Sequence, residues 1–191
     1  MIKNIGFAVT GSFCMHKKIL KLIKTLKAKG YNILPIVSQT VYYTDTRFGK
    51  SKDFIAEIEI ATENKVIKSV VEAEPIGPKS LIDILIVAPC TGNTLSKISS
   101  AVTDNAVTMA VKSHLRQNKP VLIGVSSNDA LGKNSENLGK LINAKNIYFI
   151  PFGQDDYINK PNSLISNWTL TEKAMLEAEK GRQLQPIIIS Y

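Results

Sequence analysis

Small polar side chains that could bind an anion are concentrated in residues 88–105, directly after an apolar run. The run at 81–88 predicts a buried strand, and Pro89 predicts a tight turn after it. Thr91, Asn93 and Thr94 then open a predicted helix. Because the first N–H groups of a helix lack partners and lie at the positive end of its dipole, such a start favours an anion or nucleotide site. A purely structural turn would need only one capping residue.

Similar turns follow the other predicted strands, which lie at 5–9, 31–37 and 120–125. Each turn is rich in hydroxyl, amide or glycine residues: Thr10-Gly11-Ser12, Ser38-Gln39-Thr40 and residues 126–129. Parallel strands end at one edge of their sheet, and ligands of open α/β sheets bind there. Any one turn could be an ordinary cap, but four together predict a ligand site at that edge.

The elements that must position these turns alternate between strand and helix. Apolar spacing predicts helices ending at Gly30 and over 54–60, 93–114, 137–142 and 163–180, with Asp104-Asn105 as an interruption point. A rigid, non-helical loop is predicted at 72–79, a last core strand at 146–150, and an edge strand or a contact with a neighbour at 186–189. The pattern predicts an α/β fold, a three-layer Rossmann-like (flavodoxin-like) parallel sheet with helices on both faces. Without a linker or repeat, residues 1–191 are expected to form one domain.

Composition narrows the class of protein. Hydrophobic residues make up 44% of the chain, enough for a full core, and no apolar run is long enough to span a bilayer. The first residues lack a signal-peptide pattern, so a cytoplasmic protein without membrane contact is expected. The two cysteines, Cys14 and Cys90, form no metal-binding spacing and are interpreted as packing thiols rather than nucleophiles.

The net charge is +8, and much of it lies in one predicted helix. A solvated helix face is the favoured interpretation, with an acidic partner or the steering of an anionic substrate as alternatives. Nucleic acid is disfavoured, because no aromatic residues interleave with the lysines. The helix carries Lys17, Lys18, Lys21, Lys24, Lys27 and Lys29.

The turns favour a mononucleotide over a dinucleotide. The turn at 10–12 has one glycine rather than the dinucleotide fingerprint, and no acidic residue follows the strand at 31–37. A Walker loop is absent as well. A single phosphate held by Gly11, Ser12, Ser38 and the turn at 91–94, as in FMN, fits these residues better.

These motifs resemble the flavoprotein family that includes the flavin-dependent cysteine and phosphopantothenoylcysteine decarboxylases and the flavin prenyltransferases. The resemblance covers about residues 3–150 and rests on Gly11-Ser12, Pro89 to Thr94, Lys97 and Asp104-Asn105. It implies bound FMN and homo-oligomers with flavin at subunit contacts. It also places Asn128 where the decarboxylases have an asparagine that contacts substrate. The implied FMN-binding residues are Gly11, Ser12, Ser38, Thr91, Gly92, Asn93 and Thr94.

A second resemblance spans nearly the whole chain. Residues 44–49, 71–79, 127–132, 146–156 and 160–163 are similar to the family of dipicolinate synthase B subunits. This resemblance implies a role in spore formation, in the cytoplasm of the mother cell. It also implies an A subunit as partner, and oxidation of a dihydrodipicolinate-type compound to pyridine-2,6-dicarboxylate with NADP.

A substrate with two carboxylates calls for a cationic clamp and a base. Arg47 is the candidate clamp, against the alternative of a surface arginine paired with Asp45, and Lys79 is a weaker candidate. Asn128 is the other candidate for substrate contact. Three carboxylates remain open as the base: Glu72, Glu74 and Asp129.

Two alternative functions remain beside this one. A stand-alone FMN-dependent decarboxylase or prenyltransferase is disfavoured, because neither His16 nor His114 falls at the decarboxylases' catalytic position. The second alternative is a non-catalytic subunit that lacks flavin and binds a partner through its basic helix. The sequence leaves open whether FMN here or NADP on the A subunit accepts the hydride.

Overall fold

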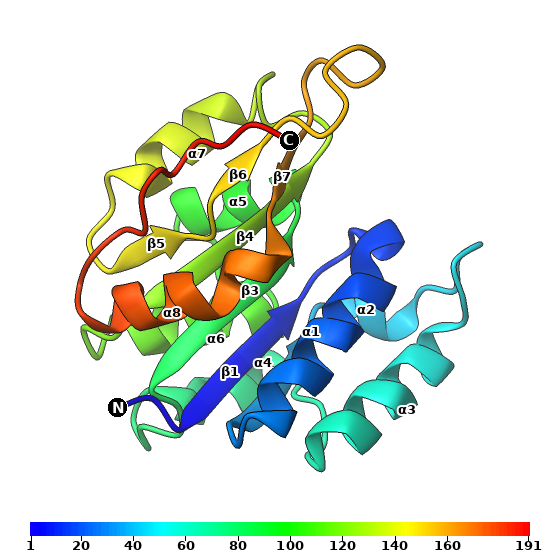
Figure 1. Cartoon of the computed structure of the whole chain (residues 1–191). Helices are drawn as coiled ribbons and strands as arrows, with labels where there is room; N and C mark the ends of the chain where they lie inside the picture. Colours follow the sequence, from blue (N-terminus) through cyan, green and yellow to red (C-terminus); the bar gives the residue numbers. More distant parts are fainter.

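A single seven-stranded sheet forms the centre of the computed structural model, which describes all residues from Met1 to Tyr191 (Figure 1). Helices cover both faces of this sheet. The strands are β1 (Asn4–Val9), β2 (Asn32–Val37), β3 (Ile84–Cys90), β4 (Val121–Ser127), β5 (Ile147–Phe149), β6 (Phe152–Gly153) and β7 (Leu164–Ser166).

Five of the strands are parallel and run in the order β2-β1-β3-β4-β5. This is the flavodoxin-like order, so the predicted fold class is confirmed. The chain then adds two short antiparallel strands, which the sequence pattern did not predict. β7 pairs with the end of β4 through Ser126 and Ser127, and β6 pairs with β7.

Each face of the sheet has its own apolar core, because successive side chains of a strand point to opposite faces. In β3, Ile84 and Ile86 belong to one core, whereas Leu85 and Val87 belong to the other. The first core is covered by α1 (His16–Ala28), α3 (Ser51–Thr62) and α8 (Thr171–Glu179). The second is covered by α4 (Val70–Ala73), α5 (Gly92–Ser99), α6 (Ala106–Leu115) and α7 (Ser135–Ile142).

The predicted helix over 163–180 was wrong in its first half. Residues 164–166 form β7, a 3-10 turn covers Trp168–Leu170, and α8 begins only at Thr171. The Ser166 hydroxyl accepts from the Val125 amide at 2.8 Å and donates to the Ile150 carbonyl at 3.0 Å. These contacts with distant strands outweigh the local helical pattern.

Three smaller predictions also need correction. The loop at 72–79 contains helical turns, because Ser69 and Glu72 form a capping box that starts α4. Pro89 lies within β3, which begins later and ends later than predicted, and the Ala88-Pro89 peptide bond is cis. The polar loop after β2 is a short helix, α2 (Gln39–Tyr43).

Other predicted boundaries are confirmed. Gly30, with φ of +90°, follows the end of α1. The stretch 93–114 is interrupted before Asn105, whose side chain accepts from the amides of Val107 and Thr108 and so begins α6. The tail at 186–189 pairs with β6 through Phe152 and Ile188. No helix has the length and apolar character that crossing a membrane requires.

Candidate functional site

Three of the polar turns are hydrogen-bonded to one another at the carboxyl edge of the sheet. The Thr10 hydroxyl donates to the Pro89 carbonyl at 2.6 Å and accepts from the Thr91 amide at 3.2 Å. Farther along the edge, the Ser12 and Ser126 hydroxyls are 2.8 Å apart. The ends of β1, β3 and β4 are therefore held together, as the sequence predicted.

A small polar pocket of about 280 Å³ lies where two helices begin. At the start of α5, Thr91 accepts from the Thr94 amide at 3.3 Å, which leaves the Gly92 and Asn93 amides without an intrahelical acceptor. At the start of α2, Ser38 accepts from the Val41 amide at 3.3 Å. No hydrophobic residue lines this pocket, whose lining is Thr10, Gly11, Ser38, Gln39, Thr40, Thr91, Asn93, Thr94, Lys97, Asp104 and Asn105.

The charges in this polar pocket are one lysine and one aspartate. Lys97 Nζ lies 2.6 Å from Asp104 Oδ2, and this contact lowers the pKa of Asp104. Hydroxyl, side-chain amide and backbone N–H groups supply the other polar atoms. An anion with several oxygens, such as a phosphate, therefore matches the donors that this pocket offers.

A larger cavity of about 780 Å³ adjoins the polar pocket and shares Gly11, Thr91 and Asn93 with it. Apolar side chains form part of its wall: Phe13, Met15, Phe48, Leu164 and Ile165. The structure thus brings together the seven residues predicted to bind FMN and the two candidates for substrate contact, Arg47 and Asn128. Gly11, Ser12, Ser38, Thr91, Gly92, Asn93, Thr94, Arg47 and Asn128 each line the polar pocket, the cavity or both.

The Arg47 guanidinium lies on the cavity wall without an ion pair. Its carbon Cζ is 4.9 Å from the centre of the Phe48 ring, and no carboxylate oxygen lies within 4.0 Å of it. The alternative pairing with Asp45 was wrong, because Asp45 instead accepts from the amide and hydroxyl of Ser51, at 2.9 and 3.2 Å. Arg47 is therefore free to pair with a ligand carboxylate.

Asp129 is the only one of the three candidate bases that lines the cavity. Its carboxylate accepts from the Ser127 hydroxyl at 2.5 Å and from Asn134 Nδ2 at 2.6 Å. Asn137 in turn donates to Asn134 at 2.9 Å, and Ser99 donates to Asn137 at 2.6 Å. The network fixes the Asp129 carboxylate against α5 and α7.

The other candidates from the sequence lie away from the cavity. Glu72 accepts from the amides of Lys68 and Ser69, which lower its pKa, and Glu74 lies in the turn after α4. Lys79 precedes β3 and so lies toward the amino edge of the sheet.

Neither histidine lines the polar pocket or the cavity. His16 is buried, with Nε2 3.1 Å from the Thr10 carbonyl oxygen and its ring stacked on Phe54 at 4.2 Å. His114 is buried in the last turn of α6, and burial lowers the pKa of both histidines. Of the cysteines, Cys14 is exposed at the cavity, whereas Cys90 is buried in β3 and burial raises the pKa of its thiol.

Sequence reasoning missed two charged residues of the cavity, Asp155 and Lys160. Both lie in the segment between β6 and β7, which returns over the carboxyl edge only because β7 pairs with β4. Local sequence holds no signal for that pairing.

The fold and the two adjoining pockets define an α/β protein with a small polar pocket beside a larger cavity at the carboxyl edge of its sheet. The chain belongs to the flavoprotein family, whose model matches residues 1–169. Over 187 residues it is 44% identical to the dipicolinate synthase B subunit of Bacillus subtilis (strain 168), covering 98% of this chain and 94% of the relative.

Solved structures agree with this assignment. The crystal structure of the dipicolinate synthase B subunit from Bacillus halodurans C superposes with a TM-score of 0.90 and 44% identity, over 98% of this chain and 96% of that one. The FMN-binding protein AtHal3 has a TM-score of 0.67 and 16% identity, over 95% of this chain and 99% of that one. At 16% identity, this second comparison shows that the two proteins share a fold.

Proposed function

We propose that this chain acts as the B subunit of a dipicolinate synthase. With an A subunit it would oxidise a dihydrodipicolinate-type compound to pyridine-2,6-dicarboxylate in the cytoplasm of a spore-forming cell. One observation carries the proposal: the small polar pocket adjoins a larger cavity that is lined by an unpaired Arg47. The chain in which this occurs is 44% identical to the Bacillus subtilis B subunit. A homo-oligomer is part of the proposal, as the resemblance to the flavoprotein family implies.

FMN fits the residues that are present. The seven predicted residues would hold it, with the phosphate at the Gly92 and Asn93 amides and the Ser38 and Thr91 turns. The flavin ring would lie in the adjoining cavity, against Phe13 and Met15. When bound, FMN would supply a two-electron acceptor, and NADP on the partner subunit would be the alternative acceptor.

The dicarboxylate would bind in the larger cavity. Arg47 and Lys160 both line it. Lys160 Nζ lies 4.0 Å from Asp156 Oδ2, at the outer limit of an ion pair, so each of the two substrate carboxylates would have a cation to pair with. Asn128 offers an amide to the same ligand. Aromatisation of the dihydro ring releases one proton and one hydride equivalent. Asp129, which accepts hydrogen bonds from Ser127 and Asn134 at the cavity, would take the proton.

The experiment that tests this function uses the purified chain and a candidate A subunit. We expect the two to co-purify and to form dipicolinate, followed by its ultraviolet absorbance, in the presence of NADP but not in its absence. The chain alone, or the A subunit alone, serves as control. Full activity of the A subunit without this chain would contradict the proposal.

A further inference from the structure

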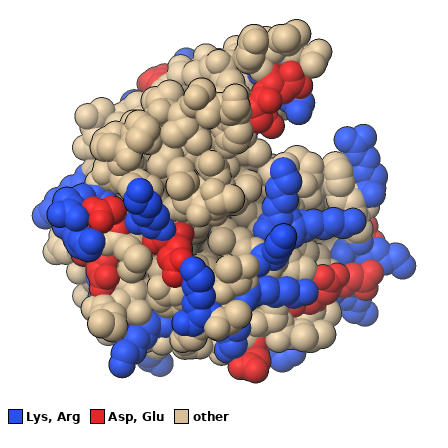
Figure 2. All heavy atoms as spheres, in the orientation of Figure 1, with Lys and Arg blue, Asp and Glu red and all other residues tan.

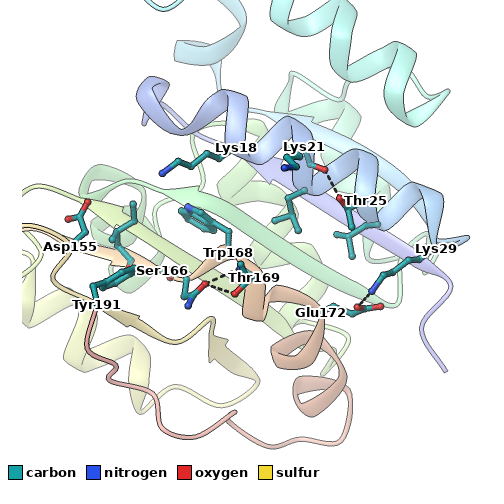
Figure 3. A pocket seen from close by; sticks show the side chains of 14 residues that line it. Lys18, Lys21, Thr25, Lys29, Asp155, Ser166, Trp168, Thr169, Glu172 and Tyr191 are labelled. Carbon is teal, nitrogen blue, oxygen red and sulfur yellow. Dashed lines mark hydrogen bonds and ion pairs between the residues drawn. The ribbon is translucent and has the colours of Figure 1, made fainter.

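A groove of about 610 Å³ separates α1 from the C-terminal part of the chain (Figure 3). The indole of Trp168 lies on the backbone of β4, so close that a Cβ at Gly124 would be 2.6 Å from it. Its Nε1 is buried and has no hydrogen-bond partner. The other apolar lining comes from Leu22, Leu26, Ile165 and the ring of Tyr191. Part of the groove wall is therefore aromatic and aliphatic.

The two ends of this groove differ. An ion pair between Lys29 and Glu172 closes one end, and Asp155 and Tyr191 stand at the other (Figure 3). Asp155 and Ile165 also line the cavity of about 780 Å³. The open end of the groove thus leads toward the proposed substrate site.

The α1 side of the groove carries uncompensated positive charge. Lys17, Lys18, Lys21 and Lys24 are on the surface, and no carboxylate lies within ion-pair distance of them. Lys18 and Lys21 line the groove itself, whereas Lys17 lines a neighbouring pocket with Asp53 and Glu57. Figure 2 shows the blue side chains gathered over the surface where α1 lies. Unpaired cations beside an apolar groove wall favour a ligand that carries both carboxylates and an apolar side chain.

We propose that the basic face of α1 and the Trp168 groove dock an acidic segment of the partner subunit. The segment's carboxylates pair with Lys18, Lys21 and Lys24, and an apolar side chain packs on Trp168 and Leu22. The proposal rests on the proposed function, which supplies the partner. A partner segment bound in the groove would extend to its open end, next to the proposed substrate cavity.

A two-fold contact with a second copy of this chain fits the surface poorly. Its net charge is +8, and a two-fold contact through this face would set the same lysines against each other. An acidic partner segment has no such repulsion.

The test compares two charge-reversal variants for binding to the A subunit. Lys18→Glu/Lys21→Glu alters the groove, and Lys112→Glu/Lys145→Glu makes the same change of net charge at exposed, unpaired lysines of the opposite helix layer. We expect the groove variant to bind at least about tenfold more weakly and the control within about twofold of the unmodified chain. High salt should weaken the unmodified pair toward the level of the groove variant.

The groove also has a built-in reporter, because Trp168 is the only tryptophan of the chain. Labelled with 5-fluorotryptophan, the chain gives one fluorine resonance, which we expect to shift when unlabelled A subunit is added. Equal binding by the two variants, or a resonance that does not move while the complex forms, would overturn the docking surface and leave the partnership intact. No association of the unmodified chains would overturn both.

Discussion

The backbone of Gly92 packs directly against the carboxylate of Asp129. A Cβ on residue 92 would lie 2.6 Å from Asp129 Oδ1, and it would also lie 2.7 Å from Asn134 Nδ2. The first turn of α5 and the Asp129 network are therefore fitted to each other, and the glycine is required by the protein's own side chains.

Gly92→Ala should lower the free energy of unfolding by about 1–3 kcal/mol, because the extra methyl group overpacks this contact. Gly139→Ala is the matched control: it lies inside α7, and a Cβ there meets nothing within 4 Å. The control should raise stability by about 0.5–1 kcal/mol. Urea unfolding measures both, and equal stability of the two variants would contradict the packing described.

Arg47→Ala should raise the KM for the dihydrodipicolinate-type substrate roughly 10- to 100-fold in the complex with the A subunit, because a charge-assisted contact is lost. Flavin occupancy should stay unchanged. Arg116→Ala, at an exposed arginine after α6, is the control and should leave KM unchanged. Unaltered turnover and KM in Arg47→Ala would reject its role as a clamp.

His114 makes the protein sensitive to acid. Burial, with Lys119 nearby, lowers its pKa to about 4, whereas an unfolded histidine titrates near about 6.5. The unfolded chain therefore binds more protons in this range, so stability is full above about pH 6.5 and falls by up to about 3 kcal/mol toward pH 4.

His114→Leu should flatten this pH dependence of the free energy of unfolding. His16, whose pKa is also lowered by burial, keeps part of it in the variant. Urea titrations at neutral and acidic pH measure the slope. A slope identical to that of the unmodified chain would refute the assignment to His114.

The sequence predicted the parallel sheet and the clustering of the polar turns at one edge for a physical reason. Short apolar strands and capped helix starts are local patterns, and the geometry of a parallel sheet brings the turns at Gly11, Ser38 and Asn93 to one edge. The prediction that these turns share one edge therefore needed no knowledge of long-range packing.

What the sequence could not predict depends on contacts between distant segments. Pairing of β7 with β4 converts part of a predicted helix into a strand, carries Lys160 to the cavity and places Trp168 beside α1. The choice of Asp129 over Glu72 and Glu74 likewise required the tertiary structure. Each depends on which surfaces meet, and composition or spacing does not determine that.

The most direct measurement compares equilibrium binding of FMN and riboflavin to the purified chain, followed by flavin fluorescence. The two ligands share the ring and differ in the phosphate. The comparison therefore measures what the polar pocket at the start of α5 contributes to binding. We predict that FMN binds at least about tenfold more tightly than riboflavin, because charge-assisted hydrogen bonds to the phosphate are available only to FMN. Equal affinity for the two ligands, or no binding of FMN, would contradict the account.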